Sequence, residues 1–403
     1  MVPKLRFSFK SALLPYKLGT LTQWSSGGTP SKDNKSYWDG DISWFTAASM
    51  KSNELSVSPT KISNSGLVNG SRLANKDDIL LLVRGSMLFN KIPVGILLNE
   101  AAFNQDVKAI KSLKNFNHTF ALQWFLAKEP LLLSMVTGTG IGAGKLDTKE
   151  LQSLDVYLPG NEEQIKITDF LSSVDEKITL LNKQHQLLCQ YNKGMMQKIF
   201  SQELRLEGFK ERWVSKYLGD VASKIGSGST PRGGSEVYQS TGVPFIRSQN
   251  VHNGQLNLKD LAFISSEVDE KMKGSRVKSG DVLLNITGAS IGRSCVVPEY
   301  FKHGNVNQHV CIIRLPNDHP KFLQAFISSE QGQKLIDNTQ SGSGREGLNF
   351  ENIRNFKIYF PSIEEQTKIA DFLSAIDDKI TAKKVQLDKL KTWKQGLLQQ
   401  MFV

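Results

Sequence analysis

The chain has 403 residues, of which 39% are hydrophobic and 22% are charged, and its formal net charge is +11. This length exceeds what one hydrophobic core supports, so we expect two or more domains. Three scattered cysteines argue against a disulfide framework and a zinc site, and we expect a cytoplasmic protein. The apolar runs are too short for a membrane span.

The basic excess is shared between the two halves of the chain. Counting Lys and Arg against Asp and Glu, residues 1–200 carry a net charge of +6 and residues 201–403 carry +5. This even distribution favours a polyanionic partner that each half meets once. An ordinary basic protein is the alternative interpretation of the same counts.

Residues 1–158 form the first predicted domain. Their Gly, Ser, Thr and Asn content and short β-branched runs predict strands and loops, with a helix over Phe120–Pro130. The run GTGIGAGKL from Gly138 departs from a nucleotide-binding P-loop, because Leu146 stands where Ser or Thr follows the lysine. We expect either a flexible loop that approaches a phosphate through Lys145 or a plain connection.

Residues 159–202 form a predicted spacer helix. Apolar residues recur at alternating steps of three and four from Leu171 to Ile199, which places one apolar seam along a helix. At about 1.5 Å per residue, the 39 residues of Glu162–Phe200 extend about 58 Å. A helix of that length cannot bury its seam alone, so we expect a second helix against it.

The second half of the chain repeats the first. The segment EEQIKITDFLSSVDEKIT from Glu162 recurs as EEQTKIADFLSAIDDKIT from Glu364, with 13 identical residues at an offset of 202 positions. The repeat predicts a second domain over residues 203–360 and a second spacer helix over residues 361–403. The fold class we expect is α+β: two mixed α/β domains separated by two long antiparallel coiled-coil helices, with a pseudo-twofold internal repeat.

Polar residues interrupt both predicted seams. His185 and Asn192 do so in the first helix, and Lys383 and Lys394 do so in the second. Polar residues at seam positions fix the register of paired helices at some cost in stability.

Capping signals mark where the predicted helices begin. Ser362 and Glu365 have the spacing of a capping box, in which each side chain bonds a backbone N–H of the other residue. Gly160 or Asn161 is expected to cap the first spacer helix. A further helix is expected in the second domain over Lys321–Ile336.

The sequence carries no recognisable catalytic motif. It contains no G-x-S-x-G, no H-E-x-x-H and no Asp-Pro-Pro-Tyr-like tetrapeptide of adenine methylation, and its six histidines lack metal-ligand spacing. Binding is therefore favoured over catalysis.

The side chains suited to nucleic acid lie in the loops of both predicted domains. Arg and Lys neutralise phosphates and read guanine, whereas Gln and Asn match the edge of adenine. A solvated polar loop is the alternative for each residue. The candidates for DNA contact are Lys32, Lys35, Thr46, Lys51, Arg84 and Lys145 in the first domain and Arg232, Arg247, Gln249, Asn250, Arg293 and Arg345 in the second.

Weaker repeats relate the loops of the two domains. GGTP from Gly27 corresponds to GSTP from Gly228, WFTAASMK from Trp44 to FIRSQNV from Phe245, and FNQDVKAIK from Phe103 to VNQHVCIIR from Val306. The loops thus match in position and differ in residues, as expected if each domain reads a different sequence on a common frame.

The repeated helix, which follows a strand ending in YLP or YFP, resembles the specificity subunit of type I restriction–modification systems, and GGTP and GSTP support this resemblance over essentially the whole chain. The resemblance implies a non-catalytic subunit whose two target-recognition domains bind a bipartite DNA target, with the helices setting the unread spacer. It also implies two modification subunits that methylate adenine with S-adenosylmethionine, and restriction subunits that use ATP and Mg. No cofactor is expected on this chain itself.

Charged side chains on the spacer helices are candidates for docking the modification subunits. A solvated helix surface is the alternative for each of them. The candidates are Glu162, Glu163, Asp175, Lys177, Glu364, Glu365, Asp377 and Lys379.

Two other functions fit parts of the sequence. A self-sufficient DNA methyltransferase would need a cofactor loop and a base-pocket tetrapeptide, and the sequence contains neither. A coiled-coil scaffold that reads no DNA would account for the helices, but not for a basic excess that both halves share.

Overall fold

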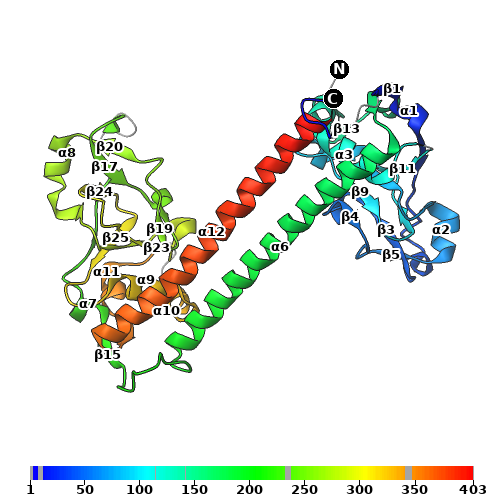
Figure 1. Ribbon diagram of the computed structural model, residues 1–403. Helices are drawn as coiled ribbons and strands as arrows, with labels where there is room; N and C mark the ends of the chain where they lie inside the picture. The colour runs from blue at the N-terminus through cyan, green and yellow to red at the C-terminus, as the bar shows by residue number, and fades with distance from the viewer. Residues whose placement is uncertain are drawn as a thin grey trace. The chain divides into compact units, whose positions relative to one another are not determined.

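The computed structural model of the protein describes residues 3–7, 12–113, 115–140, 142–231, 237–340 and 347–402 (Figure 1). The chain divides into two compact units. Unit 1 contains Met1–Asn182 and Val385–Val403, and unit 2 contains Lys183–Lys384.

The predicted spacer helices are the two longest elements. α6 spans Asn161–Phe200 and α12 spans Ile363–Met401, which are 40 and 39 residues, and each is drawn as one unbroken helix in Figure 1. The boundary between the units falls within both helices, so each helix contributes to both units.

Unit 1 has two principal sheets, whose strand orders are β2–β11–β7–β9–β4 and β5–β3–β10–β6. The first contains β2 (Thr22–Ser26), β11 (Val107–Ser112), β7 (Ile79–Leu82), β9 (Val94–Leu97) and β4 (Glu54–Leu55), and the second contains β5 (Lys61–Ile62), β3 (Ile42–Phe45), β10 (Ala101–Phe103) and β6 (Leu73–Ala74). Beside them are a ribbon of β1 (Leu14–Lys17) and β14 (Asp155–Leu158) and a small sheet of β12 (Thr137–Gly138), β13 (Gly144–Lys145) and β8 (Arg84–Gly85). The helices are α1 (Leu18–Leu21), α2 (Asn64–Gly70), α3 (His118–Ala127), α4 (Glu129–Ser134) and α5 (Thr148–Gln152), with 3-10 turns η1 (Lys35–Tyr37), η2 (Ala47–Ser49) and η3 (Ser86–Phe89).

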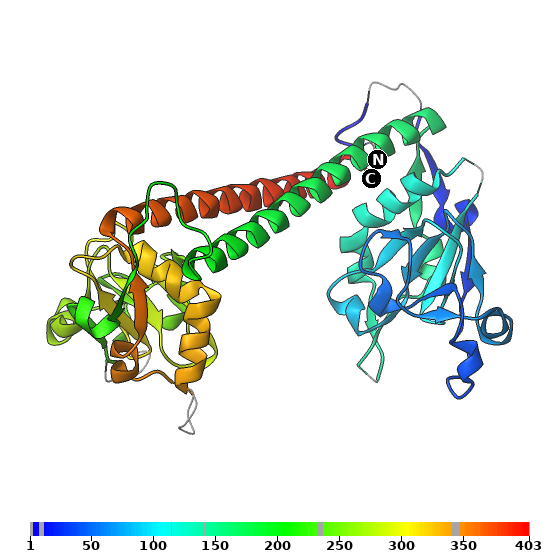
Figure 2. The same cartoon turned by 90° about the horizontal axis from the view of Figure 1, so that it is seen from below.

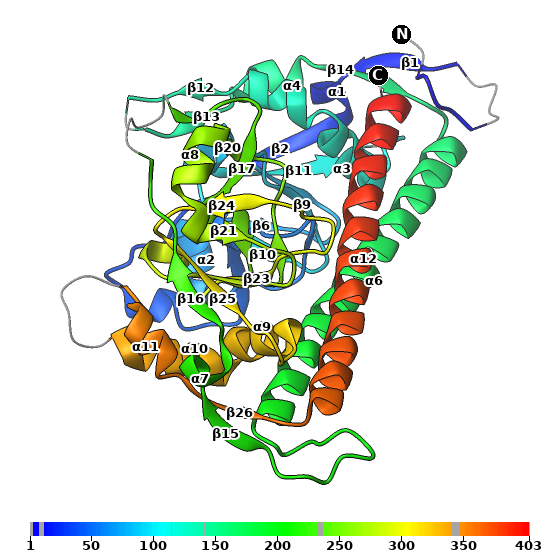
Figure 3. The ribbon, with the colours of Figure 1, turned by 90° about the vertical axis from the view of Figure 1, so that its left-hand side faces the viewer.

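Unit 2 repeats the order of the first four strands of the first sheet as β16–β25–β22–β23, without a counterpart of β4 in that sheet, and repeats the second sheet as β20–β17–β24–β21. The first sheet contains β16 (Lys224–Ser227), β25 (Val310–Arg314), β22 (Val282–Asn285) and β23 (Ser294–Val296), and the second contains β20 (Ala262–Ile264), β17 (Val243–Ile246), β24 (Gly304–Val306) and β21 (Arg276–Val277). A ribbon of β15 (Val214–Tyr217) and β26 (Lys357–Phe360) leads into α12 (Figure 3), and β18 (Val251–His252) pairs with β19 (Gln255–Leu256). The helices are α7 (Leu218–Val221), α8 (Ser266–Lys271), α9 (Pro320–Ser328), α10 (Glu330–Gln340) and α11 (Phe350–Arg354), with 3-10 turns η5 (Ser248–Asn250), η6 (Lys273–Ser275) and η7 (Gly288–Ser290). The predicted internal repeat therefore extends to the strand order of both domains.

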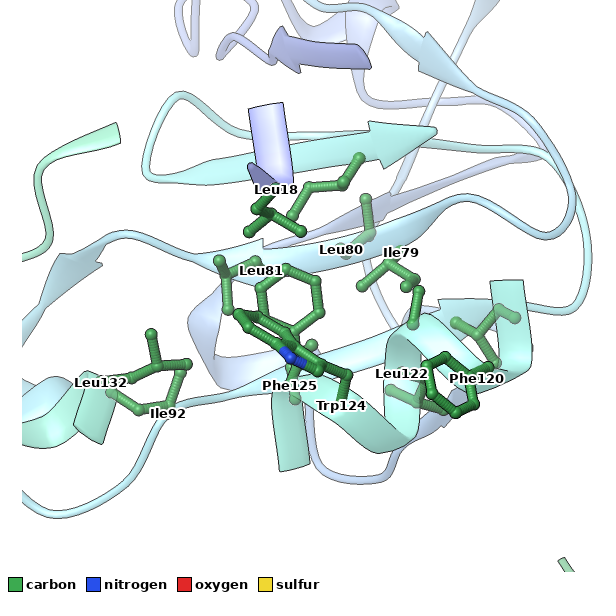
Figure 4. Packing of buried hydrophobic residues seen from close by; sticks show 14 of the residues in the cluster. Leu18, Ile79, Leu80, Leu81, Ile92, Phe120, Leu122, Trp124, Phe125 and Leu132 are labelled. Carbon is green, nitrogen blue, oxygen red and sulfur yellow. The ribbon is translucent and has the colours of Figure 1, made fainter. Parts of the chain in front are cut away.

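The core of unit 1 forms where α3 packs against the sheet that contains β7, β9 and β11. All four residues of β7 are buried, as expected for an apolar strand covered on both faces. Phe120, Trp124 and Phe125 of α3 pack beside Ile79 and Leu81 (Figure 4). In unit 2 the residues of β22 are buried in the same way.

The last residues of each long helix pack into these cores. Phe402 follows α12 and packs against Phe120 in unit 1, with 5.0 Å between the ring centroids. Phe200 ends α6 and packs against Phe322 in unit 2, with 5.5 Å between the centroids. Each helix therefore begins on one core and ends on the other.

The predicted seam is confirmed. Every seam position from Leu171 to Ile199 and from Leu373 to Met401 is buried or half-buried. In unit 1 the first half of α6 packs against the second half of α12, and in unit 2 the remaining halves pack together.

Two polar pairs set the antiparallel register. In unit 1, Lys394 Nζ donates to Asp175 Oδ2 at 2.7 Å, and in unit 2, Asn192 Nδ2 donates to Asp377 Oδ1 at 2.7 Å. Asp377 follows Asp175 by the repeat offset, and Lys394 follows Asn192 by the same offset, so the pairs are equivalent. A slip of the helices would leave these seam groups unpaired, which is costly in an apolar seam.

A buried ion pair joins the start of each long helix to the first residues of its domain. Glu163 is 1% exposed and accepts from Arg6 Nε and Nη2 at 2.6 Å each. Glu365 is also 1% exposed and accepts from Arg205 Nε at 2.7 Å and Nη2 at 2.6 Å. Trp213 Nε1 donates a third hydrogen bond to the Glu365 carboxylate at 3.3 Å.

The glutamine that follows each buried glutamate joins the helix to its own domain. Gln164 Oε1 accepts from the amide of Asn117 at 2.9 Å, and Gln366 Oε1 accepts from the amide of His319 at 2.9 Å. Asn117 and His319 immediately precede α3 and α9. The repeated EEQ motif is therefore the joint between each long helix and its domain.

The predicted capping box at α12 is half formed. Ser362 Oγ accepts from the Glu365 amide at 3.4 Å, but the Glu365 carboxylate bonds Arg205 and does not return to Ser362. A bidentate guanidinium is the stronger partner, because both groups are charged. At α6 the Gly160 carbonyl accepts from the amides of Glu163 and Gln164, both at 3.0 Å.

The two predicted shorter helices each divide in two. The segment Phe120–Pro130 is split between α3 and α4, because Pro130 fits only the first turn of a helix. The segment Lys321–Ile336 is split between α9 and α10, which Figure 2 draws as two separate helices. The division falls at Ser329, whose backbone is extended.

The three cysteines are free thiols. Burial raises the pKa of Cys295 and of Cys311 to about 12, so both are held as neutral thiols. Within the described part of the chain, no helix combines the length and the apolar character needed to cross a bilayer.

Replacing Arg205 with alanine should lower the free energy of unfolding by about 3 kcal/mol or more, because it leaves the Glu365 carboxylate buried without its cation. Urea denaturation of the full chain measures this change. Arg212→Ala removes the same charge from an exposed position and is the matched control. Equal stability of the two variants would contradict the role of the buried pair.

Candidate nucleic-acid interface

Three predicted DNA-contact residues of the first domain line one open depression. Lys32, Lys35 and Thr46 surround a volume of about 740 Å³, together with Trp38 and Gln105. Both lysines are exposed, and η1 begins at Lys35 after the Asn34 side chain caps its backbone. Cations beside aromatic and amide groups are the combination that phosphates and base edges require.

Arg84 and Lys145 stand directly opposite each other on paired strands. β8 and β13 are antiparallel, with Arg84 in register with Lys145, and both side chains are exposed. Like charges at facing positions destabilise a sheet, so this pair is better explained by an anionic ligand than by stability. Gly138 ends β12 and Gly144–Lys145 form β13, so both ends of the run GTGIGAGKL are paired strands, and the approach of Lys145 to a phosphate stays a prediction.

A second depression of about 660 Å³ surrounds this pair. Gln105 lines both depressions, so the two lie on either side of this residue. Lys108 and Lys149 add two more cations. Asp147 is the one acid among its lining residues, and hydrogen bonds from the amides of Glu150 and Lys149 lower the pKa of that carboxyl, which keeps it ionised.

The equivalent face of unit 2 presents different side chains. Arg247 occupies the place of Thr46, since each precedes a 3-10 turn and donates its amide to the residue three positions later. The Arg247 guanidinium lies over the Tyr238 ring, with 5.6 Å from Cζ to the centroid. Its Nε is buried and has no hydrogen-bond partner within the described residues, so the group retains donor capacity.

Thr287 and Gly347 occupy the places of Arg84 and Lys145. They form the equivalent antiparallel bridge in unit 2, and neither is charged. Unit 1 therefore has a cationic pair where unit 2 has a hydroxyl and a bare backbone.

The remaining candidates in the second domain have different surroundings. Gln249 and Arg293 are exposed, in η5 and after η7. Asn250 is fully buried, and its side chain bonds the carbonyls of Asn257 and Asp260 and the amide of Arg247, so it supports the turn and is removed from the DNA-contact set. Arg232 and Arg345 lie outside the described residues. In unit 1, Lys51 is exposed but lines neither depression.

Two glutamines absent from the sequence-based candidates occupy equivalent places. Gln105 lies between β10 and β11, and Gln308 lies between β24 and β25; both are exposed, and each follows a buried asparagine. Thr29 Oγ1 donates to Gln105 Oε1 at 2.6 Å, and Thr230 Oγ1 donates to Gln308 Oε1. The repeats GGTP and FNQDV, with their second-half counterparts, carried the signal for these residues.

The first glycine of each TP motif permits this geometry. A Cβ at Gly27 would lie 2.1 Å from the Phe103 carbonyl oxygen, and one at Gly228 would lie 1.6 Å from the Val306 carbonyl oxygen. Only glycine allows the motif to approach the strand that precedes each glutamine.

The candidate docking residues separate into three groups. Glu162, Lys177, Glu364 and Lys379 are exposed on the helices. Asp175 and Asp377 belong to the two polar pairs of the seam. Glu163 and Glu365 are buried in ion pairs with arginines, so their carboxylates are not available to a partner, and they are removed from the docking set.

The described residues contain no cluster of three or more His, Cys, Asp and Glu side chains with the geometry of a metal site. What the face of each unit offers is cations, amides and hydroxyls around a preformed turn. These groups bind phosphates and base edges without any chemical step.

Comparisons with known proteins agree on one family. The model of the type I restriction modification DNA specificity domain matches residues 14–190 and again residues 210–392. The specificity subunit of the type I restriction enzyme MjaVIII from Methanocaldococcus jannaschii is 26% identical over 346 residues, covering 82% of this chain and 80% of that subunit. The MjaIX specificity subunit from the same organism is 24% identical over 401 residues, covering 95% and 90% of the two chains. The crystal structure of a type I restriction–modification S subunit from M. genitalium superposes with a TM-score of 0.63 at 17% identity, covering 100% of this chain and 99% of that one.

Replacing Arg84 with alanine should weaken binding to duplex DNA and reduce the slope of log K against log salt by about 0.9, because one phosphate contact is lost. Titrations at several salt concentrations measure both effects. Arg72→Ala is the control, since Arg72 is exposed in the same unit and lines neither depression. Thermal stability should be unchanged or higher in R84A, because a like-charge pair is removed. An unchanged salt slope would remove Arg84 from the interface.

Proposed function

The chain belongs to the type I restriction–modification DNA specificity family, and on this premise we propose that each of its two target-recognition domains reads one half of a bipartite DNA sequence. The protein is the DNA specificity subunit of such a system and is non-catalytic within the complex. The target sequences themselves are set by the side chains on the face of each domain.

The observation that supports this proposal is that the two domains share a backbone arrangement but present different side chains at equivalent positions. Both units share the order of four strands in each principal sheet, and in both a threonine hydroxyl bonds the equivalent glutamine. Around that glutamine, Thr46 is replaced by Arg247 and Arg84 by Thr287. Two equivalent backbones that carry different hydrogen-bond donors and different charges are suited to two different half-sites.

We assign the recognition role to residues 1–158 and 203–360 and the spacer role to residues 159–202 and 361–403. The polar pairs at Asp175 and Asp377 fix the register of the spacer helices, so the helix length determines the spacing between the two readers. We further propose that the protein acts in the cytoplasm, where its DNA target lies.

The exposed helix surface is proposed to dock two modification subunits. Glu162 and Lys177 in one repeat and Glu364 and Lys379 in the other offer equivalent charged positions. Tyr191 is 52% exposed and Trp393, at the equivalent position of the repeat, is 49% exposed. Large exposed aromatic side chains are typical anchors of protein interfaces.

The proposed complex supplies the chemistry that this chain lacks. S-adenosylmethionine would be bound by the modification subunits, which methylate adenine, and ATP and Mg by restriction subunits. The role of this chain is to choose the DNA sequence.

Selection from random duplexes by the full chain should enrich two short motifs separated by a fixed unread spacer. Deleting residues 181–187 and 382–388 together removes one heptad from each helix, or about 10.5 Å. The spacer should then shorten by up to about three base pairs at about 3.4 Å each, while each half-site stays the same. Altered half-sites would contradict the division of roles, and the absence of any enrichment would favour a scaffold that reads no DNA.

Trp393→Ala should weaken the binding of one modification subunit by about tenfold or more, because an aromatic anchor is lost. Tyr191→Ala should affect the other copy in the same way. Native mass spectrometry of the complex would show a shift from two bound copies to one in each single variant. Lys389→Ala alters another exposed residue of α12 and is the control. Two retained copies in both aromatic variants would place docking elsewhere.

A further inference from the structure

One element of the recognition face is the same in both units. Gln105 and Gln308 are exposed amides on equivalent turns, and each accepts a hydrogen bond from the threonine of the TP motif. Chemically different residues surround them. This contrast between a constant centre and variable surroundings has a consequence for the DNA target.

The turns that carry the glutamines are rigid. Asn104 Oδ1 accepts from the amide of Asp106 at 3.2 Å, and Asn307 Oδ1 accepts from the amide of His309 at 3.0 Å, so each turn is closed by the asparagine before the glutamine. Both asparagines are buried. The glutamine therefore projects from a fixed backbone, as positioning against a base edge requires.

The threonine contact orients the amide without consuming it. A carbonyl oxygen has two acceptor sites, and the hydroxyl of Thr29 occupies one of those on Gln105. The second acceptor site and the amide N–H groups remain for a ligand. In unit 2, Gln308 Nε2 also lies 3.0 Å from His309 Nε2, which uses one of its two N–H groups and leaves the other.

A glutamine amide with one free acceptor site and one free donor matches the N6 and N7 atoms of adenine in the major groove. Resting on the proposed function, we propose that Gln105 and Gln308 each read an adenine, so that the two half-sites share this base at equivalent positions.

The residues around each glutamine specify the bases that differ. Asp106 follows Gln105, whereas His309 follows Gln308 and bonds Thr287 Oγ1 through Nδ1 at 2.5 Å. Gln105 also lines the same depression as Arg84. The flanking bases in the first half-site are therefore read by groups that include Arg84 and Asp106, and those in the second by the Thr287 hydroxyl, the His309 imidazole and Arg247.

Selection from random duplexes by the full chain tests the proposal through five proteins: wild type, Q105A, Q308A, Q105E and the control Q23A. The wild-type target should contain one adenine at the same place in both half-sites. Q105A should lose about tenfold preference at that position of the first half-site only, and Q308A at that of the second only. Q23A changes an exposed glutamine of β2 that lines neither depression, and its target should equal that of wild type.

Q105E makes the test sharper, because a carboxylate accepts hydrogen bonds and cannot donate one to N7. Its preference should change from adenine to cytosine, whose N4 is a donor. A target without a shared adenine, or Q105A and Q308A targets identical to that of wild type, would overturn this proposal while leaving bipartite reading intact. No enrichment by the wild-type chain would instead overturn the proposed function.

Discussion

A buried carboxylate at the start of each long helix is the constraint on which the architecture depends. Glu163 and Glu365 lose their hydration, and bidentate arginines from segments far away in sequence offset that cost. The pair therefore fixes where the helix leaves its domain and holds the first residues of that domain at the same point. With the neighbouring glutamine bonded to the backbone before α3 or α9, the helix cannot pivot relative to the domain that carries the recognition face.

The other end of each helix is fixed by packing. Phe200 and Phe402 reach the aromatic residues of α9 and α3, and the seam between the helices is pinned by one polar pair in each unit. Length and register of the two helices are thus linked, since a change in one helix alone would separate the polar pairs. Recognition is left to short turns whose backbones are held by Gly, Thr and Asn, so their exposed side chains are free to vary between the units.

The helices and their seam could be predicted because a heptad pattern is a local property of the sequence. The burial of Glu163 and Glu365 in the EEQ motif could not be predicted. An acidic residue in the first turn of a helix is ordinarily exposed, and burial of these two depends on an arginine 157 or 160 positions away. Asn250 was misassigned for a similar reason: an amide in a polar loop looks the same in sequence whether it faces solvent or supports a turn. Gln105 and Gln308 were visible in the repeat, but their exposure is set by strand pairing at β10 and β24, which sequence alone does not specify.

Unit 2 is a continuous stretch of chain, whereas unit 1 is closed by residues 385–403 after an interruption of one whole domain. On the ribosome, the second globule can therefore complete its fold while the first still lacks part of its core. Until α12 emerges, Leu171 and Val174 of α6 lack the residues of α12 that belong to the same core cluster. Synthesis of this protein thus passes through a nascent form in which apolar side chains of α6 are exposed. Chaperones or an early-binding partner would need to cover them.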